Sequence, residues 1–139
     1  MKRKICLITF LIVSLIINLA CARCEEKPKD NTIDFEAQGF QKLSATAYCM
    51  GHHTANGSPV HPGGCASSRE HLGDVAIIYT IDGNFLGYYE CNDLGGTEGI
   101  QNGYVIDLYR SNLTQCQSFM KLIAANDYKV WVKYIEGEG

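Results

Sequence analysis

The chain has 139 residues, of which 46% are hydrophobic, and its formal net charge is −3. This length suits a single domain. Loss of the three basic residues at positions 2–4 with an export signal would change the charge from −3 to −6. This acidic balance argues against a nucleic-acid partner, because phosphate binding needs clustered Lys and Arg.

The first 22 residues have the three parts of an export signal. Residues 2–4 are basic, residues 5–20 are apolar except for three polar positions, and Ala20-Cys21-Ala22 forms a small-x-small cleavage site. We therefore predict an exported protein, extracellular or attached to the cell envelope, with cleavage near Ala22. Two alternatives stay open. The apolar run of 16 residues can remain as a membrane anchor, or Cys21 can be lipidated, since Leu19-Ala20-Cys21 resembles the end of a lipobox.

Residues 23–38 are predicted to form a linker, and residues 39–139 the domain. The linker is charged and contains Pro28. Alternating or β-branched segments predict strands within the domain, and Asp82-Gly83 favours a tight hairpin turn between two of them. The predicted strands are 43–48, 74–80, 84–92, 104–109 and 129–135. Residues 49–68 are rich in Gly, Pro, His and Ser and predict a long loop.

One amphipathic helix is predicted over residues 112–125. Asn112 is a suitable N-cap, and Gln115 can complete a capping box. Apolar residues then recur on one helical face, at positions 113, 116, 119, 120, 123 and 124. Many short strands with one late helix indicate a mainly β protein, a compact barrel with one packed α-helix.

Four of the seven cysteines lie in the domain: Cys49, Cys65, Cys91 and Cys116. In an exported domain they predict up to two disulfides, for which three pairings exist. We expect Cys49 to bridge to Cys65 at the ends of the long loop, and Cys91 to approach Cys116. The alternative is that some of them are buried thiols that pack as small hydrophobic groups.

The same loop contains His52, His53 and His61 between Cys49 and Cys65. Cys49-x2-His52 and His61-x3-Cys65 loosely resemble zinc-ligand spacing, but the strong signal, paired Cys-x2-Cys, is missing. We therefore expect neither a metal nor a cofactor, and we place the histidines on the loop surface.

Two aspartates stand at unusual positions. Asp93 opens a Gly-Gly turn at the end of a strand, and Asp107 lies between Ile106 and Leu108 within an apolar strand. Alternation places Asp107 on the face opposite Ile106 and Leu108, either solvated or directed into a cleft. Desolvation in a cleft raises the pKa of a carboxyl group, which is what a general acid at neutral pH requires.

Five short motifs occur in an order that resembles one bacterial family, the "3D" (three-aspartate) domain. They are Ala45-Thr46-Ala47-Tyr48, Thr54-Ala55-Asn56-Gly57, Leu72-Gly73, Asn92-Asp93-Leu94-Gly95-Gly96 and Ile106-Asp107-Leu108-Tyr109. This family is similar to the catalytic barrel of membrane-bound lytic transglycosylase A. The resemblance covers residues 43–135 and implies a six-stranded double-psi β-barrel with one packed helix.

The sequence departs from the family pattern at three places. Asp107 matches the third family aspartate with its context intact. Asp93 matches the second, although Asn92 and Leu94 replace the flanking Glu and Thr. The first aspartate has no counterpart, and Ser67 or Ser68 stands near its place in a segment that is also shorter.

The resemblance implies cleavage of peptidoglycan glycan strands by lytic transglycosylation, in which one carboxyl group acts first as acid and then as base. Asp107 is the expected acid and Asp93 its helper. The expected groove residues are Thr46, Tyr48, His52, His53, Gly95, Gly96 and Tyr109. We expect a monomer that contacts the membrane only through its N-terminal segment.

Two other functions stay open. The first is a polysaccharide-binding barrel without catalysis, whose tyrosines 88, 89, 104 and 109 stack on sugar rings. The second is a small disulfide-stapled export protein in which both aspartates are solvated and far apart.

Overall fold

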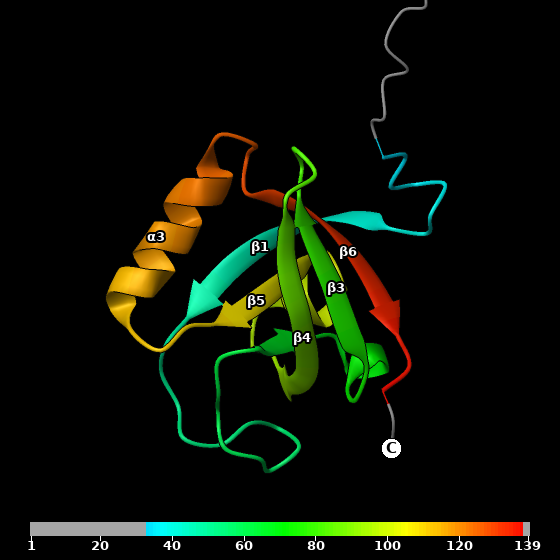
Figure 1. Ribbon diagram of the computed structural model, residues 1–139. Coiled ribbons are helices and arrows are strands. Elements are labelled where there is room, and N and C mark those ends of the chain that lie inside the picture. The colour runs from blue at the N-terminus through cyan, green and yellow to red at the C-terminus, as the bar shows by residue number, and fades with distance from the viewer. Residues whose placement is uncertain (1–32, 138–139) are drawn as a thin grey trace, which may run out of the picture. The chain divides into compact units, whose positions relative to one another are not determined.

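The computed structural model describes residues 33–137, and the predicted export signal and most of the predicted linker lie outside these residues. Six strands close into a barrel in the order β1-β5-β2-β4-β3-β6, which confirms the mainly β fold and the six-stranded barrel (Figure 1). The strands are β1 (Gln41–Tyr48), β2 (Gly64–Ser67), β3 (Val75–Thr80), β4 (Phe85–Leu94), β5 (Val105–Tyr109) and β6 (Lys129–Ile135). Two strand pairs are parallel, β1 with β5 and β2 with β4.

The predicted helix is confirmed as α3 (Leu113–Ala124), which packs outside the barrel next to β1 (Figure 1). The Asn112 side chain accepts a hydrogen bond from the Gln115 backbone N–H at 3.0 Å. The Gln115 side chain in turn accepts one from the Ser111 N–H at 3.1 Å, so Gln115 caps the residue before the N-cap. Two shorter elements were not predicted, the 3₁₀ turn η1 (Arg69–His71) and the helix α2 (Glu98–Gln101).

Strand β2 corrects the predicted long loop, which ends at Gly63 instead of Ser68. All four residues of β2 are buried, and β2 lies between β4 and β5. Its residues must be small, since a Cβ at Gly64 would lie only 3.0 Å from the Asn92 side-chain oxygen. Gly-Cys-Ala-Ser carries no β-branched or aromatic residue, so its strand propensity is low and only its neighbours define it.

The barrel interior is filled by the alternate residues of the strands. Ile106 and Leu108 of β5 are fully buried, while the residues that alternate with them, Val105, Asp107 and Tyr109, stay partly exposed. This is the alternation expected for Asp107, whose side chain is on the outer face of the barrel. Phe119 and Ile123 of α3 join the same apolar core.

The predicted cysteine pairings are wrong. Cys65 on β2 is the register partner of Cys91 on β4, and their Sγ atoms lie 3.6 Å apart, in contact but not bonded. Cys116 instead contacts Cys49, and burial followed by a hydrogen bond with Cys49 raises the pKa of the Cys116 thiol. All four described cysteines are free thiols. The pairing differs because β2 is a core strand, which brings Cys65 inside the barrel next to β4.

Phe35, within the segment expected to be linker, packs on the barrel. It is 6% exposed and stacks on Trp131 with a centroid distance of 5.4 Å. Phe40 and Tyr79 complete an aromatic cluster around it. The packed structure therefore includes residues that precede position 39. In residues 33–137, no helix has both the length and the hydropathy needed to span a membrane.

The core makes a matched prediction possible with two leucines. Leu108→Ala, at a fully buried position, should lower the free energy of unfolding by about 2 to 5 kcal/mol, because it leaves a cavity in the barrel. Leu113→Ala, at a position that is 63% exposed, should change it by less than about 0.5 kcal/mol. Urea denaturation followed by the fluorescence of Trp131 measures both. Equal losses would contradict this assignment of the core.

Candidate functional site

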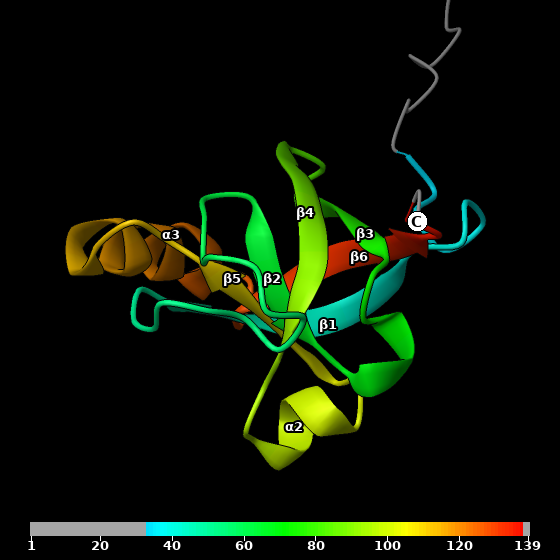
Figure 2. The same ribbon diagram turned by 90° about the horizontal axis from the view of Figure 1, so that it is seen from below.

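The two predicted catalytic aspartates flank a single alanine. Ala66 of β2 is paired with Asp107 of β5 on one side and with Asp93 of β4 on the other. Figure 2 shows β2 between these two strands. Since neighbouring strands lie about 4.8 Å apart, the two aspartate backbones are about 10 Å from each other. Ala66 between them is itself only 4% exposed.

Asp107 is held from the side of β1. Thr46 is its register partner on that strand, and the Thr46 hydroxyl donates a hydrogen bond of 2.7 Å to Asp107 Oδ1. Burial raises the pKa of Asp107, the hydrogen bond from Thr46 lowers it, and the negative charge of Asp93 raises it again. The net direction is upward, so Asp107 retains a proton to higher pH than an ordinary aspartate.

Asp93 is fixed by three donors. The backbone N–H groups of Ala55 and Leu94 donate to its Oδ1, each at 2.9 Å, and the Tyr48 hydroxyl donates to its Oδ2 at 3.2 Å. Asp93 and Asp107, both among the described residues, make no hydrogen bond with each other. Asp93 therefore acts on Asp107 through its charge. The strand β4 also continues through Asp93 to Leu94, so Asp93 lies in a strand and not at the start of a turn.

Tyr48 is bonded to Asp93 and lies within the electrostatic influence of both aspartates. Burial, the charge and hydrogen bond of Asp93, and then the charge of Asp107 raise the pKa of the Tyr48 hydroxyl above its ordinary value. This hydroxyl therefore stays a donor at neutral pH. Its ring packs edge-to-face on Tyr109, with centroids 5.3 Å apart. Of the residues that the sequence assigned to a groove, Thr46 and Tyr48 thus contact the two carboxyl groups, and Tyr109 contacts Tyr48.

The loop before β2 reaches Asp93 through its backbone. The Thr54 hydroxyl donates to the Asn56 side-chain oxygen at 2.7 Å, and the Asn56 N–H donates to the Asn92 carbonyl at 3.2 Å. These bonds hold the turn on β4 and direct the Ala55 N–H at Asp93. Ala55 and Ala66 are thus the two site residues that sequence reasoning missed as parts of the site, and neither carries a side chain that would indicate it.

The histidines of the loop lie elsewhere. His52 and His53 are exposed, and neither imidazole makes a hydrogen bond to another described residue. Their backbones shape the loop, because Val60 donates to the His52 carbonyl and His53 bridges to Pro59. His61 contacts Asn92 at 3.1 Å and Glu90 at 3.3 Å. Within residues 33–137, no three His, Cys, Asp or Glu side chains gather as metal ligands would.

The two glycines after Asp93 shape the far side of the site. A Cβ at Gly95 would overlap the Ile100 side chain, so α2 can approach β4 only because this residue is glycine. Gly96 has open space around it. A pocket of about 310 Å³ lies here, lined by Ser67, Arg69, Leu94, Gly95 and Gln101. Ser67 is therefore part of this pocket wall.

A comparison with models of known protein families finds no match, and no curated protein matches the sequence. The function must therefore be argued from the site itself. The site combines a carboxyl group of raised pKa, a second carboxyl group held by three donors, and a tyrosine hydroxyl that stays protonated. Such a set of carboxyl and hydroxyl groups can donate a proton to a neutral substrate and accept one from it.

Two substitutions should move the pKa of Asp107 in opposite directions. Thr46→Val removes the hydrogen bond that favours the charged carboxylate, so the pKa should rise. Asp93→Asn removes the neighbouring negative charge, so the pKa should fall. Carboxyl carbon chemical shifts of Asp107, followed by NMR through a pH titration, measure both. A shift of the same sign in the two variants would contradict the arrangement of this site.

Proposed function

We propose that this domain cleaves the glycan strands of peptidoglycan as a lytic transglycosylase, with Asp107 as the single acid and base. One observation carries the proposal. Asp107 has a raised pKa, lies on the outer face of the barrel where a long polymer can reach it, and is separated from the second carboxyl group, that of Asp93, by Ala66. The family resemblance of the five motifs supports it, because Thr46, Tyr48, Asp93 and Asp107 all belong to those motifs.

The chemistry needs one proton to move out and one to return. Asp107 gives its proton to the glycosidic oxygen while the bond from that oxygen to C1 of the muramic residue breaks. The C6 hydroxyl of the same sugar then attacks C1, and its proton goes to Asp107. The new C1–O6 bond closes the 1,6-anhydro ring, and the enzyme regains its starting state. No water attacks, so a second carboxylate that activates water is unnecessary.

The neighbouring residues support this double role. Thr46 orients the carboxyl group that exchanges the proton. Asp93 provides negative charge near the positive charge that develops on the sugar, and the Tyr48 hydroxyl holds Asp93 by its hydrogen bond. Gly96, which has open space around it, leaves room for the strand beside Asp93, whereas Gly95 is covered by Ile100 of α2. We propose that Asp93, Tyr48 and Tyr109 contact the sugars, and that His52 and His53, which lie on the exposed loop, reach only their outer parts.

The finer fold and the location belong to the same proposal. The parallel pairs β1–β5 and β2–β4 in a closed six-stranded barrel are compatible with the double-psi topology that the resemblance implies. Residues 1–22 would carry the domain across the membrane to peptidoglycan, and the domain would act there as a monomer without metal or cofactor.

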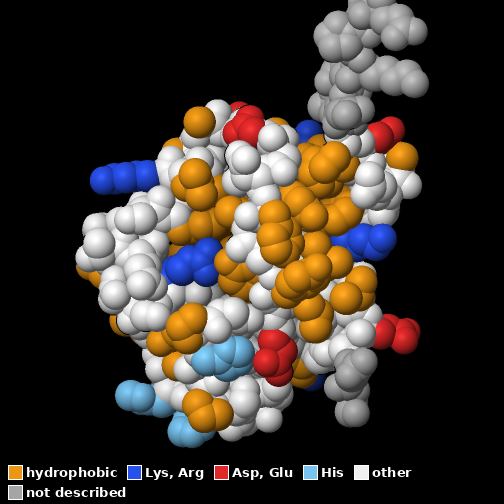
Figure 3. Space-filling model, in the orientation of Figure 1, with side chains coloured by type: hydrophobic (Ala, Val, Ile, Leu, Met, Phe, Trp, Pro, Cys, Tyr) orange, Lys and Arg blue, Asp and Glu red, His pale blue; other side chains and the backbone are white. Residues whose placement is uncertain are grey.

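A second candidate function is glycan binding without catalysis. The observation that favours it is an aromatic surface on β3 and β4, where Tyr79, Phe85 and Tyr88 pack edge-on or tilted against one another. Phe85 is 49% exposed and Tyr88 is 63% exposed. Figure 3 shows hydrophobic side chains gathered over this face. Such rings can stack on sugars, and Ser67 near the place of the first family aspartate also favours this candidate.

Digestion of purified sacculi distinguishes the two functions. The parent protein should release muropeptides with 1,6-anhydro ends, which mass spectrometry identifies. Asp107→Asn should abolish the release, because it keeps the shape and removes the proton donor. Asp93→Asn should reduce the rate less. Asp127→Asn, at an exposed position outside the site, is the matched control and should act like the parent.

The Asp107→Asn variant should also remain folded. Because the folded-state pKa of Asp107 is raised, the carboxyl group stabilises the fold while it is protonated and loses this contribution as the pH rises through that pKa. At neutral pH the neutral amide should therefore be at least as stable as the parent. Anhydro products from Asp107→Asn at the parent rate would refute the catalytic assignment. Binding of sacculi without any products from the parent would favour the second candidate.

The pH dependence of cleavage gives an independent test. The reaction needs protonated Asp107, so the rate should fall as the pH rises through the pKa of this residue. Thr46→Val should move this descending limb to higher pH, in the direction of the pKa change. Initial rates of release from sacculi between pH 4 and 9, a range set by the assay, measure the limb. A limb that stays in place although the NMR-measured pKa moves would exclude Asp107 as the acid.

A further inference from the structure

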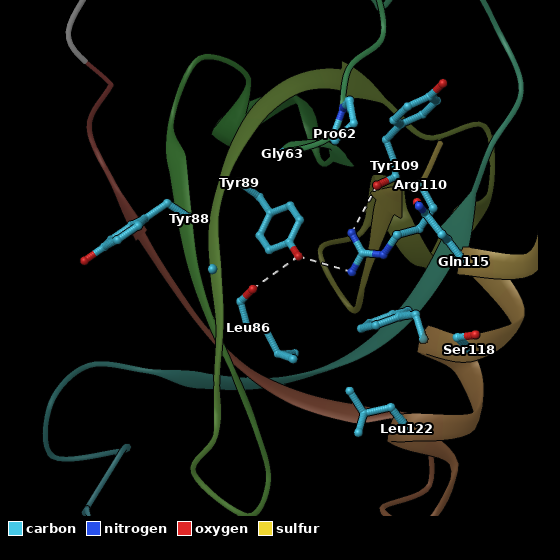
Figure 4. A pocket seen from close by; sticks show the side chains of 12 residues that line it. Pro62, Gly63, Leu86, Tyr88, Tyr89, Tyr109, Arg110, Gln115, Ser118 and Leu122 are labelled. Carbon is cyan, nitrogen blue, oxygen red and sulfur yellow. Dashed lines mark hydrogen bonds between the residues drawn. The ribbon is translucent and has the colours of Figure 1, made fainter. Parts of the chain in front are cut away.

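A pocket of about 550 Å³ lies between β4, the end of β5 and α3. Its volume falls within the range of small-molecule sites. The walls combine apolar side chains with polar groups of α3. Leu86, Phe119 and Leu122 contribute the apolar part, and Gln115 and Ser118 the polar part (Figure 4). Tyr88, although it lines the rim, points away from the pocket in this view.

Arg110 extends its guanidinium group into this pocket. One terminal nitrogen donates to the Tyr109 carbonyl at 3.0 Å, and the other donates to the Tyr89 hydroxyl at 3.1 Å. The guanidinium also lies over the Phe119 ring, 4.5 Å from its centroid. These contacts hold the guanidinium group in one position. A guanidinium has five N–H groups, and the others have no protein acceptor among the described residues.

No acidic side chain in residues 33–137 forms an ion pair with Arg110. The three pairs in this part of the chain all involve histidine. A half-buried guanidinium that lines an aromatic and aliphatic pocket without a counter-ion is unusual, because partial desolvation of a charge is costly unless another group compensates it. An anionic ligand group would supply this compensation, and a planar carboxylate matches the guanidinium fork.

We propose that this pocket binds the stem peptide of peptidoglycan, with a carboxylate of the peptide on Arg110 and its small apolar side chains against Leu86, Phe119 and Leu122. The choice of a peptide rests on the proposed function, because glycan strands carry stem peptides on their muramic residues. The mixed wall also fits a peptide, since Gln115 and Ser118 can bond to its amides.

The position of the pocket relative to the catalytic site supports this ligand. Tyr109 lines the pocket and also packs on Tyr48, which is bonded to Asp93. Tyr109 and Asp107 are two residues apart on the same face of β5, so their Cα atoms are separated by about 7 Å. A sugar at Asp107 would therefore hold its peptide within reach of the pocket. The domain would then select peptide-substituted strands over bare ones.

The test measures binding of a synthetic stem peptide, L-Ala-γ-D-Glu-L-Lys-D-Ala, by isothermal titration calorimetry without any glycan. Arg110→Gln should weaken binding about ten- to hundred-fold, because it removes a charged hydrogen-bond pair. Arg110→Lys should retain part of the affinity. Lys121→Gln, a basic residue on the exposed face of the same helix, is the matched control and should bind like the parent.

Ligand variants identify the group that is recognised. A peptide with both carboxyl groups amidated should bind the parent as weakly as the free acid binds Arg110→Gln. The two singly amidated peptides show which carboxylate contacts Arg110, and N-acetylmuramic acid tests for recognition of the lactyl carboxylate instead. Equal affinity of the parent and Arg110→Gln for the free acid would overturn the proposal, as would tighter binding of N-acetylmuramic acid than of the peptide.

The outcomes separate this inference from the proposed function. Peptide binding that depends on Arg110, in a protein that releases no anhydro products, would retain the carboxylate site and remove the transglycosylase assignment. Cleavage that depends on Asp107, together with no Arg110-dependent peptide binding, would retain the enzyme and remove the peptide site. Circular dichroism of Arg110→Gln and Arg110→Lys checks that a loss of binding does not come from a loss of fold.

Discussion

The four-residue strand β2 lies between β4 and β5, and the rest of the structure depends on how closely those strands approach it. The approach is possible because Gly64 leaves room for the Asn92 side chain and Ala66, between the two aspartates, has a small side chain. On the inner side, Cys65 and Cys91 fill the same layer of the core with small, fully buried side chains. A larger residue in β2 would separate the strands, and with them the two aspartates on either side of Ala66.

The electrostatic properties of the candidate site follow from this spacing. The charge of Asp93 is near enough to raise the pKa of Asp107, yet Asp93 is bound by the Ala55 and Leu94 N–H groups and by Tyr48 instead of by Asp107. The two acids are therefore differentiated by their surroundings, one held by donors and the other partly desolvated with a single donor. Such a division between paired carboxyl groups is what acid–base catalysis uses.

The end of β5 joins two regions of different chemistry. Asp107 belongs to a partly buried polar site, whereas Arg110, three residues later, points into a pocket of aromatic and aliphatic groups. Tyr109 is shared by the two regions, because it lines the pocket and its ring also packs on Tyr48 of the aspartate site. A polymer of alternating sugars with peptide branches has the same combination of groups: neutral rings along its length and carboxylates on its side chains.

The sequence by itself determined the long, periodic elements. The alternation around Asp107, the hairpin at Asp82-Gly83 and the helix after Asn112 were all predictable, since each depends on neighbours within a few residues. Only the tertiary structure decided the position of β2, the contacts of Cys65 with Cys91 and of Cys116 with Cys49, and the roles of Ala55 and Ala66 at the site. These features depend on residues brought together from distant segments. The groups that make the contacts are small side chains or backbone N–H groups, which leave no periodic pattern in the sequence. The pocket around Arg110 was likewise not predictable, because its walls come from the loop before β2, from β4, from the end of β5 and from α3, which only the closed barrel and the packed helix bring together.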